Sequence, residues 1–108
     1  MSLGTGILRV PSTIKKGEVF RVQMVITHPM SPPRRDPQTG QEVPPHTLTK
    51  LDLFFNDKLV STINMGAGIS ANPFIAISMV AQDNGVVKIV YEDNRGGKWE
   101  KTAELKVS

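Results

Sequence analysis

The 108-residue sequence predicts an all-β domain, and three observations support this prediction. Apolar residues recur with a period of two rather than 3.6, as expected for strands that bury one face. Turn signals interrupt these runs about every ten residues, and no segment keeps a helical period. About seven short strands at this spacing are typical of an immunoglobulin-like or fibronectin-like β-sandwich. Because no internal repeat is visible, we expect a single domain over residues 1–108.

The first half of the chain contains four predicted strands. Residues 7–10 form a short strand that Pro11 ends, and residues 20–27 show the clearest alternation in the sequence. Residues 48–55 alternate again, and the pair Asn56-Asp57 then turns the chain into residues 58–63, because Asn and Asp tolerate positive φ.

The second half contains three more predicted strands, over residues 74–81, 86–92 and 99–107. The turn sequences Asp83-Asn84-Gly85 and Asn94-Arg95-Gly96-Gly97 separate them. The apolar faces predict a core that includes Phe20, Val22, Met24, Ile26, Leu51, Leu53, Val87, Ile89 and Leu105.

The composition excludes several classes of protein. Hydrophobic residues make up 39% and charged residues 21%, which favours a folded domain over a disordered one. The net charge of +3 is spread along the chain without interleaved aromatic residues, so we expect no nucleic-acid partner. No apolar run is long enough for a membrane helix, and residues 1–4 do not resemble a secretory signal. The absence of cysteine excludes disulfides, thiolate metal sites and cysteine nucleophiles.

The sequence lacks the common catalytic motifs. It has no Gly-x-Ser-x-Gly elbow and no His-Glu-x-x-His pair. Gly66-Ala67-Gly68 resembles a phosphate-binding loop, but neither a Lys-Ser/Thr pair nor a helical pattern follows it. Asp57, Asp83 and Asp93 lie in predicted turns, where carboxylates usually accept hydrogen bonds from nearby backbone amides. We therefore expect no enzymatic activity and no cofactor.

The connection between His28 and Thr47 is unusually long, at about 20 residues, and loops of this length are usually functional or disordered. It holds six of the eight prolines, which stiffen it. His28 and His46 lie at its ends, and without a cysteine or two convergent carboxylates they fall short of a metal site. We favour a structural role for both, in hydrogen bonds to loop backbone, over a partner contact or a metal. Arg34 and Arg35 are either solvated charges or docking contacts.

Two consecutive strands are apolar on both faces. In the first, Ile75, Ile77 and Met79 lie opposite Phe74, Ala76 and Val80; in the second, Val86 and Val90 lie opposite Val87, Ile89 and Tyr91. One interpretation is a central strand covered on both sides. We prefer a protein–protein interface, because a lone chain would otherwise expose an apolar patch. The predicted interface residues are Phe74, Ile75, Ile77, Met79, Val86 and Val90.

Several blocks of residues, in order from about residue 10 to 105, resemble the SoxZ family. They are Lys16-Gly17-Glu18, Ile26-Thr27-His28-Pro29-Met30, Arg34-Arg35-Asp36, Pro44 with His46, Ile69-Ser70-Ala71-Asn72-Pro73-Phe74, and Asp93-Asn94 with Gly96. The His-Pro-Met and Ser-Ala-Asn-Pro-Phe blocks are specific in combination. Ser31-Pro32-Pro33 and Tyr91 depart from the family, which often has a glycine-containing stretch and a Trp at these places.

The resemblance implies a non-catalytic subunit of a sulfur-carrier heterodimer that serves thiosulfate oxidation. In this family the partner, SoxY, holds sulfur intermediates on a cysteine of a flexible arm while other Sox enzymes act on them. The resemblance also implies a periplasmic location, reached by co-export with the partner.

The same resemblance, together with the predicted interface, assigns roles to two loops. The predicted docking residues, for the arm of the partner or for visiting enzymes, are His28, Pro29, Met30, Arg34, Arg35, Ile69, Ser70, Ala71, Asn72 and Pro73. In isolation, we expect the chain to cover its apolar surface by forming a homodimer.

Three alternatives stay open at this point. The first is a subunit of a SoxYZ-like carrier that serves a quinoprotein dehydrogenase. The second is a metal-binding sandwich of the superoxide-reductase type, which needs a cysteine and several histidines, whereas this chain has no cysteine and two histidines. The third is a generic adhesion or ligand-binding sandwich, which leaves the ordered motif blocks unexplained.

Overall fold

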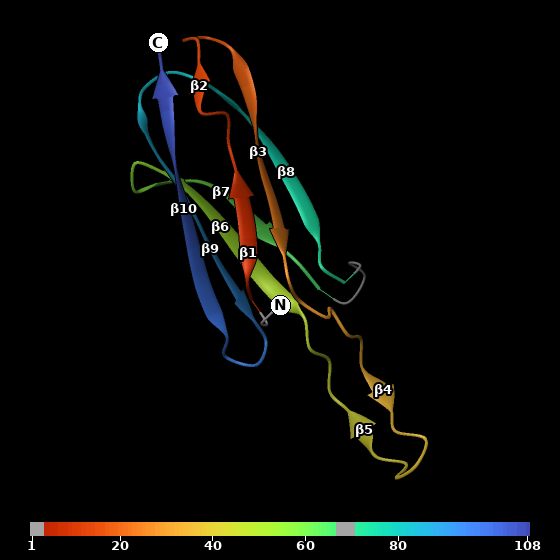
Figure 1. Cartoon of the computed structure of the whole chain (residues 1–108). Coiled ribbons are helices and arrows are strands. Elements are labelled where there is room, and N and C mark those ends of the chain that lie inside the picture. Colours follow the sequence, from red (N-terminus) through yellow and green to blue (C-terminus); the bar gives the residue numbers. More distant parts are fainter. Residues whose placement is uncertain (1–3, 67–70) are drawn as a thin grey trace.

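The computed structural model describes residues 4–66 and 71–108, whose strands form two facing sheets and a projecting hairpin (Figure 1). One sheet has the order β1-β3-β8, with β1 at Gly6–Arg9, β3 at Val19–Ile26 and β8 at Phe74–Val80. The other has the order β2-β10-β9-β6-β7. Its strands are β2 (Thr13–Ile14), β10 (Lys98–Val107), β9 (Gly85–Asp93), β6 (Leu48–Phe55) and β7 (Lys58–Asn64). Among the described strands, only β2 pairs in parallel, with β10.

This architecture confirms the predicted all-β sandwich. The seven longest strands match the seven predicted segments to within two residues at each end. The sequence did not predict the two-residue strands β2, β4 (Arg34–Arg35) and β5 (Glu42–Val43). A strand of two residues is too short to show an alternating apolar pattern. Within the described residues, no helix is long and apolar enough to cross a membrane.

The core lies between the two sheets. All nine predicted core residues are buried, four from β3 and the others from β6, β9 and β10. Met30, Leu48, Ala81 and Tyr91 are also buried in it. Tyr91 stacks on Trp99 with 5.7 Å between ring centroids and donates its hydroxyl to the carbonyl of Gly4. The buried hydroxyl of Tyr91 therefore needs no hydrogen bond to water, because its one O–H donor has a backbone partner.

The predicted interface combined residues that the fold separates. Along β8, Ile75, Ile77 and Met79 pack against the core, so only the alternate side chains face outward. Val86 and Val90 face outward from β9, which belongs to the other sheet, so they point away from β8. The prediction of one surface formed by β8 with Val86 and Val90 beside it was wrong. A period of two shows which residues share a face of a strand, but it contains no information about which sheet the strand joins.

The long connection is an ordered arm rather than an unstructured loop. Strands β4 and β5 pair with each other alone and extend away from the sandwich (Figure 1). This arm, residues 31–46, makes the molecule elongated, with principal extents of 60 × 21 × 19 Å. A bridge between Ser31 and His46 closes its base, with N–H···O distances of 2.8 and 2.9 Å in the two directions.

Candidate functional site

The tip of the arm is a tight turn that its own side chains support. The backbone N–H of Asp36 donates to the carbonyl of Gln41, and the Asp36 carboxylate accepts from the N–H of Gln38, both at 2.8 Å. Gly40 has φ of 72°, a left-handed conformation that glycine adopts without strain. The proline residues on either side restrict the backbone further, which lowers the entropy cost of holding the arm in one shape.

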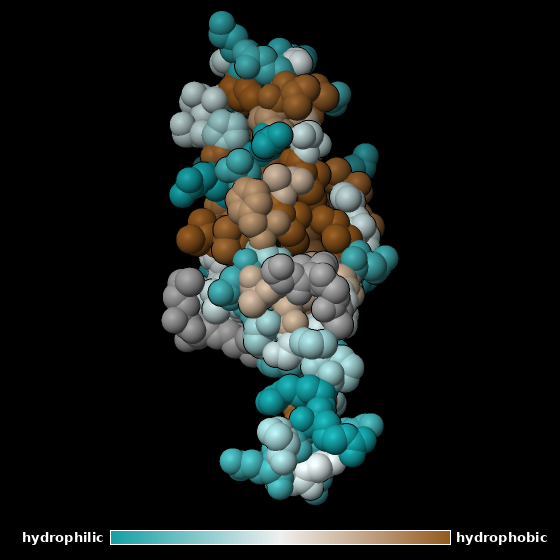
Figure 2. Space-filling view, turned by 90° about the vertical axis from the view of Figure 1, so that its right-hand side faces the viewer, coloured by the Kyte–Doolittle hydropathy of each residue, from teal (hydrophilic) through white to brown (hydrophobic). Residues whose placement is uncertain are grey.

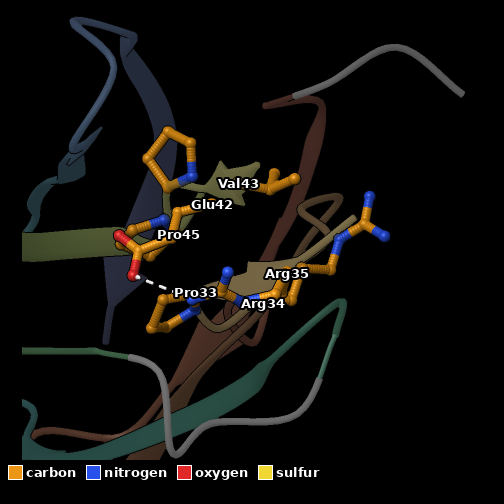
Figure 3. A pocket seen from close by; sticks show the side chains of 7 residues that line it. Pro33, Arg34, Arg35, Glu42, Val43 and Pro45 are labelled. Carbon is orange, nitrogen blue, oxygen red and sulfur yellow. Dashed lines mark ion pairs between the residues drawn. The ribbon is translucent and has the colours of Figure 1, made fainter. Parts of the chain in front are cut away.

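A groove of about 450 Å³ lies on the arm and is lined by residues of both its strands (Figure 3). Its apolar lining residues are Pro33, Val43, Pro44 and Pro45. The side chains of Arg34, Arg35 and Glu42 complete it, and Arg35 faces Glu42 with 3.9 Å between Nη2 and Oε1. Both partners of this ion pair are largely exposed, so it adds little to stability. Arg34 and Arg35 thus present charge to solvent at the far end of the molecule.

At the base of the arm, His28, His46 and Asp93 come together from three separate segments. One carboxylate oxygen of Asp93, Oδ2, lies 3.2 Å from His28 Nε2 and 2.8 Å from His46 Nε2. The two imidazoles meet edge to face, with 4.6 Å between ring centroids. His28 and Asp93 are buried, and His46 is mostly covered. This His–Asp–His cluster joins the end of β3, the return of the arm and the end of β9.

The carboxylate of Asp93 is saturated with hydrogen bonds. Its second oxygen, Oδ1, accepts from the backbone N–H of Arg95 at 3.0 Å and of Gly97 at 2.7 Å. Burial alone would raise the pKa of Asp93, but the hydrogen bonds from His46, Gly97, His28 and Arg95 outweigh it and lower the pKa to about 2. Asp93 is therefore an anion at neutral pH, as four converging donors require. Gly97 must be a glycine here, because a Cβ would meet this carboxylate and the Trp99 ring.

The hydrogen bonds of His28 define its tautomer. Its Nδ1 faces the backbone N–H of Met30 at 3.1 Å and must accept, so the proton of a neutral ring lies on Nε2 and is donated to Asp93. Burial lowers the pKa of His28, which keeps the ring neutral at pH 7. The structural role predicted for His28, a hydrogen bond to loop backbone, is confirmed.

The same tautomer works against a metal at this cluster. His28, His46 and Asp93 each offer one ligand atom, and these atoms lie within 4.8 Å of one another. A metal-bound imidazole normally donates its other ring N–H to an acceptor. A metal at Nε2 of His28 would instead place an N–H on Nδ1, opposite the Met30 N–H. The arrangement therefore fits a hydrogen-bonded junction better than a ligand set.

Asn94 and Arg95 attach the returning strand of the arm to the body. The Asn94 side chain accepts from the N–H of Thr47 at 3.0 Å and donates to the carbonyl of Pro45 at 2.8 Å. The Asn94 backbone N–H donates to the Thr47 carbonyl, and the Arg95 guanidinium donates to the Pro44 carbonyl at 3.1 Å. The turn after β9 therefore clamps the segment from Pro44 to Thr47.

Asn72 holds the segment that leads from β3 into the arm. Its side chain accepts from the N–H of His28 at 3.0 Å, and its own N–H donates to the His28 carbonyl at 2.8 Å. Asn72 has φ of 51°, which Asn tolerates better than most residues. Pro73 then leads into β8, and its carbonyl accepts from the N–H of Ile26. The His-Pro-Met and Asn-Pro-Phe blocks of the sequence therefore bind each other.

The structure separates the predicted docking residues into two groups. His28 and Met30 are buried, and Pro73 is buried as well, so their side chains do not form a docking surface here. Pro29, Arg34, Arg35, Ala71 and Asn72 are exposed and accessible to a partner. Ile69 and Ser70 lie outside the described residues. Sequence reasoning missed the convergence of Asp93 with both histidines, because 65 and 47 residues separate it from them.

Comparison with known structures places the fold. The chain is similar to the superoxide reductase (neelaredoxin) of Ignicoccus hospitalis, with a TM-score of 0.70, 20% identity, and coverage of 96% of this chain and 80% of that chain. It is also similar to the superoxide reductase of Nanoarchaeum equitans, with a TM-score of 0.66, 17% identity, and coverage of 94% and 91%. The sulfur carrier protein SoxY of Chlorobium limicola f thiosulfatophilum matches with a TM-score of 0.64 and 13% identity, over 95% of this chain and 78% of that chain.

These similarities, all at low identity, show the fold alone: an immunoglobulin-like β-sandwich of a class that includes both redox enzymes and a sulfur carrier. No curated protein matches the sequence. The family model of the Sulphur oxidation protein SoxZ matches residues 8–104. The chain therefore belongs to the SoxZ family of sulfur-oxidation proteins. The motif blocks that predicted this family lie mostly at the base of the arm.

Proposed function

We propose that this chain is the non-catalytic subunit of a SoxYZ-type carrier, which presents sulfur intermediates to thiosulfate-oxidising enzymes. The observation that carries the proposal is the match of residues 8–104 to the SoxZ family. The chain contains no cysteine and so has no thiol on which to hold a sulfur intermediate. The carrier cysteine then belongs to a SoxY-like partner, and this chain forms a heterodimer with it.

The arm suits a docking role. It projects from the sandwich, its base is held by the His–Asp–His cluster, and its strand β4 presents Arg34 and Arg35. A rigid projection loses less conformational entropy on binding than a flexible loop does. We assign it the transient contacts with visiting Sox enzymes, whose active sites must approach the cysteine of the partner.

Co-purification tests the heterodimer. The chain is co-expressed with a SoxY-like protein, and only one of the two is tagged. We expect a stable complex with one copy of each chain. Thiosulfate-dependent turnover by the Sox enzymes should require both subunits. Turnover at the full rate with the SoxY-like protein alone would disprove a scaffold role.

A second experiment tests the arm. Arg34→Glu with Arg35→Glu should leave the heterodimer intact and slow turnover, mainly by raising KM for the carrier, because rim charges act on association. Lys106→Glu, at an exposed position on β10 of the five-stranded sheet and away from the arm, is the control for a reversed charge. An unchanged KM in the double variant would show that the arm does not dock.

The location follows as a further part of the proposal. We place the chain in the periplasm, co-exported in the folded heterodimer by the signal of its partner. Cell fractionation checks this: deleting the signal of the partner should retain both subunits in the cytoplasm. Export of this chain without its partner would contradict co-export.

A further inference from the structure

The outer faces of the two sheets have different compositions. On the five-stranded sheet, charges of both signs alternate, as in the row where Lys98 pairs with Glu92 and Glu92 with Lys50. Strands β1, β3 and β8 of the other sheet contain no Asp or Glu at all. Alternating charge suits a face that stays in water, whereas a face without acids and rich in apolar side chains suits a partner.

The outer face of β1-β3-β8 holds most of the exposed large apolar side chains of the described residues. Ile7 is 54% exposed, Val19 65%, Phe74 63% and Val80 51%, and only Leu59, Val60 and Val86 of comparable exposure lie on other strands. The strand register aligns Ile7 with Val25 and Val25 with Phe74, which forms an apolar row across the whole sheet. Figure 2, viewed from the side of the molecule that carries β8, shows an apolar area in the middle of the body.

A shallow hollow of about 130 Å³ lies in this face, lined by Ile7, Arg9, Gln23, Met24, Val25 and Phe74. Its volume suits one apolar side chain, the kind of anchor that dominates protein interfaces. Arg9 at its margin is exposed, and so is Arg21 further along the sheet. Neither has an ion-pair partner among the described residues.

The charge on this face indicates whether a second copy of the chain or a different protein binds there. A second copy of the chain would bring Arg9 and Arg21 of both copies together with no acid among the strands to compensate them, and unpaired buried charges are costly. A different protein can supply the missing carboxylates. The occupant is therefore a heterologous partner rather than a second copy.

We infer that the outer face of β1-β3-β8 binds the SoxY-like subunit, through an apolar side chain of that subunit in the hollow beside Phe74 and carboxylates opposite Arg9 and Arg21. This inference rests on the proposed function and specifies its interface. It replaces the surface that the sequence suggested, because it keeps Phe74 of β8 and excludes Val86 and Val90 of the other sheet.

Affinity of the heterodimer for single variants tests the interface. Phe74→Asp should weaken binding about 30-fold or more, as expected for a central anchor. Ile7→Asp changes the same apolar row on the other edge strand. It tests the interface independently if Phe74→Asp disturbs the folding of β8. Val86→Asp is the matched control, an exposed valine on the outer face of the opposite sheet, and should change affinity less than about twofold.

Charge reversal tests the carboxylates. Arg9→Glu and Arg21→Glu should each reduce the association rate about tenfold at low salt and flatten its salt dependence. Lys88→Glu, on the five-stranded sheet, should leave both unchanged. Circular dichroism and urea midpoints establish that each variant is folded before binding is measured.

The outcomes separate the inference from the function on which it rests. If the wild-type heterodimer forms and Phe74→Asp and Ile7→Asp bind as tightly as wild type, this interface is wrong and the carrier role stands. If no heterodimer forms, both proposals fail. A homodimer of the isolated chain that Phe74→Asp dissolves, with the heterodimer unaffected, would show that a second copy occupies the face instead.

Discussion

Replacing Asp93 with asparagine tests whether the His–Asp–His cluster fixes the arm. Asp93 accepts four hydrogen bonds with its charged carboxylate, and its pKa falls from 3.8 to about 2 in the fold. At about 1.4 kcal/mol per pH unit, this shift corresponds to about 2 kcal/mol of stability at neutral pH. The asparagine side chain would also aim its amide N–H₂ group at N–H donors. Asp93→Asn should therefore lower the free energy of unfolding by about 3 kcal/mol at pH 7.

The lowered pKa of Asp93 also predicts how the stability of the fold changes with pH. A folded pKa below the unfolded value means that the unfolded chain binds the proton first, so the stabilisation is complete above pH 3.8 and declines as the pH falls towards 2. About half of it should be lost near pH 3. The lowered pKa of His28 adds an earlier loss, which begins as the pH falls through 6.5. Acid should therefore weaken the wild-type protein in two stages.

Urea unfolding followed by circular dichroism at a series of pH values measures both effects. In Asp93→Asn the stage below about pH 4 should be absent, so the difference from wild type should shrink towards about pH 2. Asp57→Asn is the matched control, because its side chain is 93% exposed and Asn also tolerates the φ of 65° there. Equal stability of Asp93→Asn and wild type at pH 7, or parallel pH profiles, would refute this account of the cluster.

Three further predictions concern the fold and the cluster. Leu53→Ala should destabilise the protein by about 2–5 kcal/mol because Leu53 is fully buried, whereas Leu59→Ala at an exposed position should change stability by less than about 0.5 kcal/mol; urea unfolding compares them. Asn72→Gly should lower the free energy of unfolding by about 1 kcal/mol, because it removes a side-chain hydrogen bond. Asn72→Ala should lower it by about 2 kcal/mol, because Ala also disfavours a φ of 51°. Equal losses in the two variants would show that the backbone conformation of Asn72 does not matter. Protein dialysed against zinc should retain no stoichiometric metal by elemental analysis, and one zinc per chain that His28→Ala abolishes would prove this wrong.

The β-sandwich could be predicted from the sequence because each long strand buries alternate residues. The alternation of Phe20, Val22, Met24 and Ile26 predicts a buried face whatever the topology is. The assignment of strands to sheets was not predictable in this way. It depends on pairing between segments far apart in the chain, as when β3 pairs with both β1 and β8. For that reason, Val86 and Val90 were placed beside β8 from sequence although they lie on the opposite sheet.

The junction at the base of the arm was beyond sequence reasoning for a related physical reason. Asp93 has the local role that its turn predicts, since it accepts from the N–H groups of Arg95 and Gly97. Its second oxygen binds His28 and His46, and only the meeting of three chain segments brings these groups together. A proline-rich stretch between two histidines indicated a special segment, but nothing in its spacing identified the acceptor.

The motifs that predict the SoxZ family form a support rather than a reactive site. His28, His46, Asn72, Asp93 and Asn94 come from separate blocks, and each makes hydrogen bonds at the base of the arm. Such buried, fully satisfied networks rigidify the segments that they join. In the proposed carrier, a chain without a thiol contributes through position, and a fixed arm at one end with an apolar, acid-free face along one sheet gives it two surfaces for that purpose. Under this proposal the motif residues define the geometry of the carrier, and the partner subunit supplies the thiol.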